Sequence, residues 1–382
     1  MQNSKMNEMP MLEVAENTIV LFHPHVPASA IEEVNQTLRS RWIGQGPKVD
    51  QFEHEFSKMF SPSHRSIAVG SGTDALHLAY ILANLQPGDE VIAPVFTCTA
   101  TNIPFLYMGV KVVFADVQEG TMNIDPKHVR ELTNERTRAI VCVHYGGLPC
   151  DLQELQEVAD HYRIPLIEDA AHAVGATYHS RSIGDISDFT IFSFQAIKHI
   201  TTGDGGMLTV KDESSIEKAK RIRWFGIDRS AKQMGIWEND IQEVGYKYQM
   251  TDIAASMGLA ALREFSATLS LRKKLFSTYE QQLKNIPGIR FVGGGYKDRE
   301  HAAWLCTVIV ERRADLQKKL REHRVESNQV HYRNDRYSIF GGRRDNLPHM
   351  DAIENNYLVL PLHTKMLPED VERVCSVIRA GW

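Results

Sequence analysis

The sequence lacks any long apolar run: nowhere do 18 apolar residues follow one another, and residues 1–16 contain no apolar stretch. A membrane-spanning helix needs about 20 consecutive apolar residues, and a secretory signal needs a short apolar core near the N-terminus. Because neither segment is present, we expect a soluble, cytoplasmic protein without a membrane partner.

Basic residues are not in excess. The chain has 43 Lys and Arg against 48 Asp and Glu, which gives a formal net charge of −5. Nucleic acids and anionic membranes are bound by clusters of basic residues. The charge balance therefore gives no support for a nucleic-acid partner.

Cysteine is scarce as well, and no two cysteines form a C-x-x-C pair. The residues are Cys98, Cys142, Cys150, Cys306 and Cys375. An odd, scattered set is typical of reduced thiols rather than of a disulfide framework or a zinc site. We therefore expect neither disulfides nor a bound metal.

What the sequence does contain is an alternation of short apolar runs with helical patterns, in a chain of 382 residues. Helical patterns such as Asp74–Leu85 and Asp151–Tyr162 lie between the runs. The expected strands are Ser66–Val69, Val91–Pro94, Lys111–Phe114, Ala139–His144, Leu166–Ile167, Thr190–Phe194 and Met207–Val210. Such alternation predicts an α/β fold with a mostly parallel sheet.

The same pattern divides the chain into three parts. We expect a disordered leader at residues 1–16, a large α/β domain at 17–260 and a smaller α+β domain at 261–382. A helix-rich segment from Thr251 to about Ile286 bridges the two domains.

Lys198 lies in a short loop between two of the expected strands. Burying a lysine amine is costly unless the amine has a partner or a chemical role. The commonest role is nucleophilic, with a lowered pKa that permits a Schiff base with a carbonyl or with pyridoxal phosphate. A loop lysine is more often an ordinary solvated charge, so Lys198 alone decides nothing.

Two other segments bear on Lys198, and each also has a simpler interpretation. Gly70–Leu76 joins a strand to a helix through small residues, which allows backbone amides to approach an anion; otherwise it is a turn with Ser71 or Thr73 as N-cap. Asp169 ends an apolar strand, where open α/β sheets bind ligands, and can pair with a cationic ring nitrogen. Otherwise Asp169 is a helix N-cap or part of a structural ion pair.

These segments, in this order, resemble the nucleotide-sugar aminotransferase family, the DegT/StrS class of fold-type I pyridoxal-phosphate enzymes. The resemblance runs from about residue 20 to the C-terminus. It is carried by Trp42–Pro47, Phe52-Glu53, Gly70–Leu76, Pro87–Val91, Glu168–His172, Ser193–Lys198, Thr202–Gly206 and Leu360–His363. It implies a large, mostly parallel seven-stranded sheet domain with helices on both faces, and a smaller C-terminal α+β domain.

Position by position, the resemblance implies a site for pyridoxal 5′-phosphate (PLP). Lys198 would form the Schiff base and shuttle protons, Asp169 would pair with the pyridinium nitrogen, and His172 would lie near the ring hydroxyl. The phosphate would be held by three residues of the family's phosphate motifs, Gly72, Thr73 and Ser193.

The resemblance also implies a reaction. L-Glutamate would give its amine to the cofactor, and a keto group on a nucleotide-linked sugar would receive it. We expect amination at C4 of a 4-keto-6-deoxyhexose, and amination at C3 of the 3-keto isomer is the close alternative. The bases that can meet the diphosphate, or form a solvated basic surface instead, are Arg221, Arg223, Arg229, His331 and Arg333.

Three positions depart from the family pattern. Cys98 replaces an aromatic residue that stacks on the cofactor, and Phe225 replaces a His.

Because family active sites lie between subunits, a homodimer is implied. Lys247 stands where an Asn reaches the phosphate of the other subunit's cofactor, and its ammonium can bind phosphate as a point charge.

Other functions remain open at this stage. A sugar dehydratase of the same fold would carry His in place of Lys198, and only the adjacent His199 favours it. A PLP enzyme acting on amino acids alone, such as a desulfurase or aldolase, is a second alternative. A non-catalytic PLP-binding regulator or paralogue is a third.

Overall fold

The computed structural model describes residue 14, residues 16–238 and residues 240–382. The disorder expected for residues 1–16 falls almost wholly outside the described residues and stays a prediction. In the described part of the chain, no helix combines the length and the apolar character needed to cross a membrane.

The centre of the molecule is a seven-stranded sheet in the order β1-β10-β9-β6-β5-β2-β4. The strands are β1 (Arg65–Val69), β2 (Glu90–Pro94), β4 (Lys111–Ala115), β5 (Thr137–Val143), β6 (Leu166–Asp169), β9 (Phe189–Ser193) and β10 (Gly206–Val210). The five neighbouring strands β9, β6, β5, β2 and β4 pair in parallel, whereas β10 is antiparallel to both β1 and β9. The prediction of a mostly parallel sheet is confirmed, and all seven expected strands are present.

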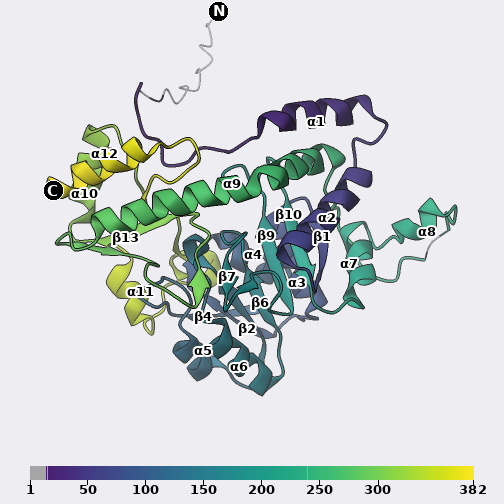
Figure 1. Ribbon diagram of the computed structural model, residues 1–382. Coiled ribbons are helices and arrows are strands. Elements are labelled where there is room, and N and C mark those ends of the chain that lie inside the picture. The colour runs from purple at the N-terminus through teal and green to yellow at the C-terminus, as the bar shows by residue number, and fades with distance from the viewer. Residues whose placement is uncertain (1–13, 15, 239) are drawn as a thin grey trace, which may run out of the picture.

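Helices cover both faces of this sheet (Figure 1). One face packs against α2 (Pro47–Phe60), α5 (Pro126–Leu132), α6 (Leu152–Tyr162) and the first half of α9 (Asp252–Leu283). The other face packs against α3 (Gly72–Leu82), α4 (Thr99–Tyr107) and α7 (Ser215–Arg223). Because both faces are buried, the strands are apolar nearly throughout, as parallel strands usually are.

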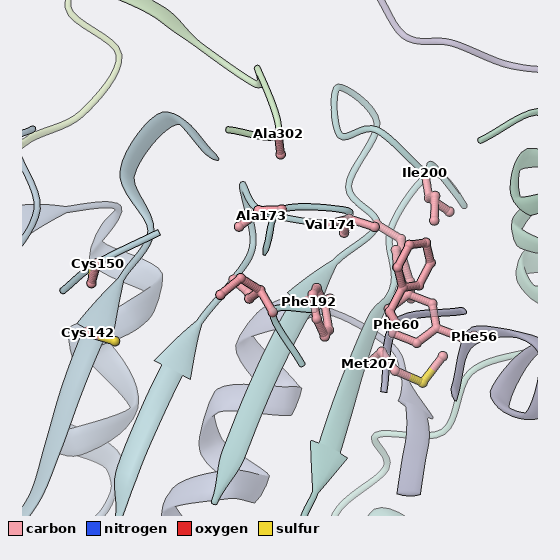
Figure 2. Close-up of a cluster of buried hydrophobic side chains, with 14 of the residues drawn as sticks. Phe56, Phe60, Cys142, Cys150, Ala173, Val174, Phe192, Ile200, Met207 and Ala302 are labelled. Atoms are coloured by element: carbon pink, nitrogen blue, oxygen red, sulfur yellow. The ribbon is translucent and has the colours of Figure 1, made fainter. Parts of the chain in front are cut away.

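Aromatic side chains fill the layer between the sheet and α2. The Phe56 ring lies 4.8 Å from that of Phe60 and 5.0 Å from that of Phe192, between ring centroids. Figure 2 shows these three rings gathered beside Met207. Tilted and edge-to-face pairs of this kind add to the stabilisation that burial provides.

A second hydrophobic cluster is built from the C-terminal part of the chain and the second half of α9. A three-stranded antiparallel sheet, β11 (Ile289–Phe291), β13 (Cys306–Val310) and β15 (Tyr357–Leu360), packs there with α10 (Arg313–Glu322) and α12 (Pro368–Arg379). The domain boundary expected between residues 260 and 261 lies inside α9 and stays a prediction.

The remaining elements are short or peripheral. They are α1 (Ala28–Arg39), β3 (Phe96–Thr97), β7 (Thr177–Tyr178), β8 (Arg181–Ser182), α8 (Arg229–Gln233), β12 (Arg299–Glu300), β14 (Tyr332–Arg333) and α11 (Pro348–Ile353). The β14–β3 pair matters for the site, because it brings the segment around residue 331 beside that around residue 97.

Candidate active site

A cavity of about 280 Å³ lies at the carboxyl ends of β6 and β9, beside the N-terminus of α3. Its lining includes most of the residues that the sequence indicated, namely Gly72, Thr73, Asp169, His172, Ser193, Lys198 and His331. Cys98 and Trp304 line it as well. Ligands of open α/β sheets bind at this end of the strands.

Lys198 follows β9 in a turn closed by a hydrogen bond from its amide to the carbonyl of Gln195 (2.9 Å). Its Nζ lies 3.6 Å from the centroid of the Trp304 ring. Burial lowers the pKa of this amine from its ordinary 10.5 to about 7, although the nearby Cys98 and Asp169 act in the opposite direction. A substantial share of the amine is therefore unprotonated and nucleophilic at neutral pH.

Asp169 is the last residue of β6, and only 4% of it is exposed. Its Oδ2 accepts a hydrogen bond from Thr101 Oγ1 (2.7 Å), and its Oδ1 accepts one from the Ala171 amide (3.1 Å). Burial raises the pKa of this carboxyl, and the bond from Thr101 opposes the rise. In the described residues Asp169 neither caps a helix nor joins an ion pair, so a cationic ligand group is the partner that would keep it ionised.

The N-terminus of α3 forms a cradle for an anion. Ser71 is the N-cap and accepts a hydrogen bond from the Asp74 amide (3.0 Å). The first amides of a helix have no partner inside it and carry a partial positive charge. A Cβ at Gly72 would lie 3.0 Å from the Cβ of Ser193. The absence of a side chain at Gly72 thus allows the Ser193 hydroxyl to stand beside the helix end.

Three rings stack at the cavity wall. The centroid of the His172 ring lies 3.8 Å from that of Trp304 and 5.2 Å from that of His331, and the ring planes in both pairs are nearly parallel. Burial lowers the pKa of His172 well below its usual range and that of His331 to about 3. Within the described structure, His172 Nδ1 and His331 Nε2 are buried without a hydrogen-bond partner. Both neutral rings can therefore offer a polar atom to a ligand.

A buried network behind the cavity fixes the strand that carries Asp169. The Nε2 of His144 lies 2.8 Å from Glu168 Oε2, and its Nδ1 accepts from the Cys150 amide (3.0 Å). The His144 amide donates to the Asp169 carbonyl (3.2 Å). Cys142, His144 and Cys150 lie close enough to hold a metal ion. Both ring nitrogens of His144 already have partners, so the network is one of hydrogen bonds.

Five of the residues indicated by the sequence do not line this cavity, and two of them, Arg221 and Arg229, lie with Arg223 at a separate cavity. Arg223 is buried and lies 2.5 Å from Glu53 Oε1, beside that separate cavity of about 290 Å³. Lys247 is exposed, with Nζ 5.7 Å from the centroid of the Trp224 ring. Arg333 is paired with three acids of its own chain, Asp335, Asp351 and Glu354. A role for these five residues toward the substrate or a partner subunit stays a prediction.

The structure also brings in residues that the sequence did not single out. Thr101 holds Asp169, and Trp304 contacts both Lys198 and His172. Trp304 lies in an apolar run more than 100 residues after Lys198, and an aromatic residue in such a run looks like any core residue.

The donor set of the cavity matches the polar groups of PLP. Lys198 suits the aldehyde, Asp169 the ring nitrogen, and the α3 N-terminus with Ser193 the phosphate. His172, with its unpartnered Nδ1, suits the ring hydroxyl. The residues present therefore fit this cofactor.

Comparison with known proteins agrees with this geometry. The model of the DegT/DnrJ/EryC1/StrS aminotransferase family matches residues 25–379. The spore coat polysaccharide biosynthesis protein SpsC of Bacillus subtilis is 35% identical over 373 residues, which are 93% of this chain and 95% of that protein.

Solved structures are similar over the same length. Sugar aminotransferase CalS13 from Micromonospora echinospora has a TM-score of 0.91 at 29% identity, over 95% of this chain and 100% of that one. Spr1654 from Streptococcus pneumoniae, in its PLP form, has a TM-score of 0.89 at 30% identity, over 95% of this chain and 98% of that one.

Proposed function

Because the chain belongs to the DegT/DnrJ/EryC1/StrS aminotransferase family, we propose that it moves the amino group of L-glutamate to C4 of a nucleoside-diphosphate-linked 4-keto-6-deoxyhexose. The protein is a PLP-dependent sugar aminotransferase. The glutamate donor, the nucleotide and the C4 position are the proposal, and amination at C3 of the 3-keto isomer is its alternative.

The observation that supports the proposal most strongly is the buried, readily deprotonated amine of Lys198 in one cavity with the buried carboxylate of Asp169. PLP, when bound, supplies an electron sink that makes the proton on the amine-bearing carbon acidic. Lys198 would hold the cofactor through its aldehyde, and the same amine, when free, would take up and return that proton. Asp169 would pair with the ring nitrogen and favour its positively charged form.

The remaining residues of the cavity position the cofactor and the sugar. Gly72, Thr73 and Ser193 hold the phosphate, and His172 lies against the ring hydroxyl. His331 is the proposed sugar contact, because it lines the cavity with an unpartnered Nε2. Glutamate leaves as the 2-oxo acid before the keto sugar enters, so one cavity serves both halves of the reaction.

The biological setting is also proposed. SpsC takes part, by its name, in the biosynthesis of a coat polysaccharide, which supports a surface polysaccharide as the destination of the amino sugar. We propose that the enzyme acts in the cytoplasm as a homodimer, with Lys247 of each subunit reaching the phosphate of the cofactor bound by the other.

A panel of nucleotide-linked sugars tests the proposal. The enzyme is incubated with glutamate and either 3-keto or 4-keto sugars, and the product is identified by mass and NMR. We expect an amine at C4. An amine at C3 would select the alternative, and amination of amino-acid-derived keto acids alone would contradict the proposal.

Two further measurements separate a catalyst from a PLP-binding regulator. Glutamate should bleach the colour of the bound cofactor, and an unchanged spectrum would favour the regulator. Lys198→Ala should abolish transfer, while Lys127→Ala, at an exposed lysine, should not. Transfer by the Lys198→Ala variant would refute the proposed role of this amine.

A further inference from the structure

Arg272 is a buried cation outside the cavity. It lies in α9, and only 4% of it is exposed. Burial lowers its pKa to about 10, and no acidic group of the described residues offsets this effect. The guanidinium is therefore charged at neutral pH without a carboxylate partner, which is costly for folding.

The partners that Arg272 does have are two consecutive backbone carbonyls. Its Nε donates to the carbonyl of Ala303 (3.2 Å), and an Nη donates to that of Trp304 (3.3 Å). Ala303 is fully buried with φ of +54°, in the left-handed region. A non-glycine residue persists there only when its surroundings hold it.

Other contacts hold the same segment from the opposite side. The amides of Trp304 and Leu305 both donate to the carbonyl of Gly146 (2.9 Å). The indole Nε1 donates to the carbonyl of Ile197, the residue before Lys198 (3.1 Å). Held in this way, the Trp304 indole contacts both the Lys198 amine and the His172 ring.

We propose that Arg272 is a positioning residue: by holding the carbonyls of Ala303 and Trp304, it fixes the indole against Lys198 and thereby sets the orientation of the amine that carries out the transfer. Arg272 itself touches neither substrate nor cofactor. The inference rests on the proposed role of Lys198.

The charge of Arg272 adds a second effect on the same amine. Two positive charges in one poorly solvated region disfavour each other. Of the groups that face Lys198, Cys98 and Asp169 favour its protonated form and Arg272 disfavours it, while the buried His172, His199 and His331 stay neutral.

The test compares Arg272→Met, which removes charge and donors, with Arg272→Lys, which keeps the charge. Arg263→Met is the matched control, since Arg263 is exposed on the same helix. Three quantities are measured: the pH midpoint for capture of PLP by the apoenzyme, kcat and KM for glutamate, and the melting temperature.

Arg272→Met should raise the pH midpoint by roughly half a unit or more and lower kcat about tenfold or more through misplacement of the amine. KM for glutamate should stay within about threefold, since Arg272 does not touch the substrate. Arg272→Lys should restore the midpoint and only part of kcat, and Arg263→Met should match the wild type.

Wild-type midpoint and kcat in Arg272→Met would overturn the proposal, as would losses that merely follow a lowered melting temperature without rescue by Lys. If Arg272→Met does not fold, Trp304→Phe decides: the proposal requires a reduced kcat, and an unchanged kcat overturns it. Lys198→Ala separates the proposed function from the positioning role of Arg272. Residual transfer by Lys198→Ala would refute the proposed function, whatever the result for Arg272.

Discussion

Burial acts in opposite directions on the two charged groups of the cavity. It lowers the pKa of the Lys198 amine to about 7 and raises the pKa of the Asp169 carboxyl. Burial thereby moves each group toward its neutral form. A cofactor with a positively charged ring nitrogen reverses this for Asp169, so cofactor binding and carboxylate ionisation support each other.

The pH dependence of cofactor binding follows from the lowered pKa of Lys198. Only the unprotonated amine attacks an aldehyde, and the pKa of about 7 means that Lys198 is mostly protonated below pH 7. The rate at which the apoenzyme binds PLP covalently should therefore rise through pH 7 and level off near pH 8 to 9, as read from absorbance. A rate that climbs steadily to pH 10 would show an ordinary lysine.

Among single residues, those whose side chains have a recognisable chemical role could be predicted from the sequence. Lys198, Asp169, Gly72, Ser193 and His172 all line one cavity. Trp304, Thr101 and Arg272 could not be identified, because their roles depend on contacts between distant segments rather than on their residue types. Arg333, chosen for its charge, is paired with acids that only the fold brings near.

Among the secondary-structure elements, the α3 N-terminus depends on a missing side chain. Gly72→Ala would place a methyl group 3.0 Å from the Cβ of Ser193, so Ser193 must shift. We expect PLP to bind about tenfold more weakly, with little change in the melting temperature, as measured by equilibrium dialysis and thermal unfolding.

Gly120→Ala is the control, since no atom lies within 4 Å of the added methyl group. Equal PLP affinity in both variants would contradict the assignment of this helix end to the phosphate.

A second element-scale prediction concerns the junction of α2 and α9. Asp252 is 1% exposed, and its carboxylate accepts hydrogen bonds from the amides of Gly46 (2.7 Å), Lys48 (3.2 Å) and Val49 (3.1 Å). Asp252→Ala leaves the amides of Gly46 and Lys48 without an acceptor, whereas the Val49 amide keeps its bond to the Gly46 carbonyl (3.1 Å). The free energy of unfolding should fall by about 3 kcal/mol, as measured by urea denaturation.

Asp50→Ala, at an exposed residue of the same helix, should change the free energy by less than about 0.5 kcal/mol. A similar loss in both variants would mean that the cap is not what stabilises the junction.

Strands were easier to predict than some helices, for physical reasons. Buried parallel strands are nearly all apolar and separated by helices, so each of the seven stands out in the sequence. α4 contains Pro104, a residue that normally breaks a helix, and its pattern was not recognised. The antiparallel pairing of β10 was not predicted either, because it depends on which distant strands become its neighbours.

For the molecule as a whole, the assembly prediction concerns Lys247, which does not line the cavity of its own chain. If it serves the other subunit, a mixed dimer of Lys198→Ala and Lys247→Ala subunits contains one intact site. Such dimers should regain up to about half the wild-type activity per dimer, while the Lys198→Ala homodimer has none.

The measurement uses differently tagged subunits that are expressed together and purified by both tags. Recovery no greater than that of the Lys247→Ala homodimer would show that Lys247 acts within its own chain, or not at all.

α9 also bears on how the molecule unfolds. Its 32 residues make a rod about 48 Å long at about 1.5 Å per residue. Leu259 and Phe265 on its first half belong to the cluster beneath the large sheet, whereas Leu275 and Tyr279 on its second half belong to the C-terminal cluster. Unfolding of either cluster removes the packing from one half of α9, so we expect the two clusters to unfold together. Calorimetry should record a single endotherm, and a chain cut after residue 260 should yield two fragments that fold only together.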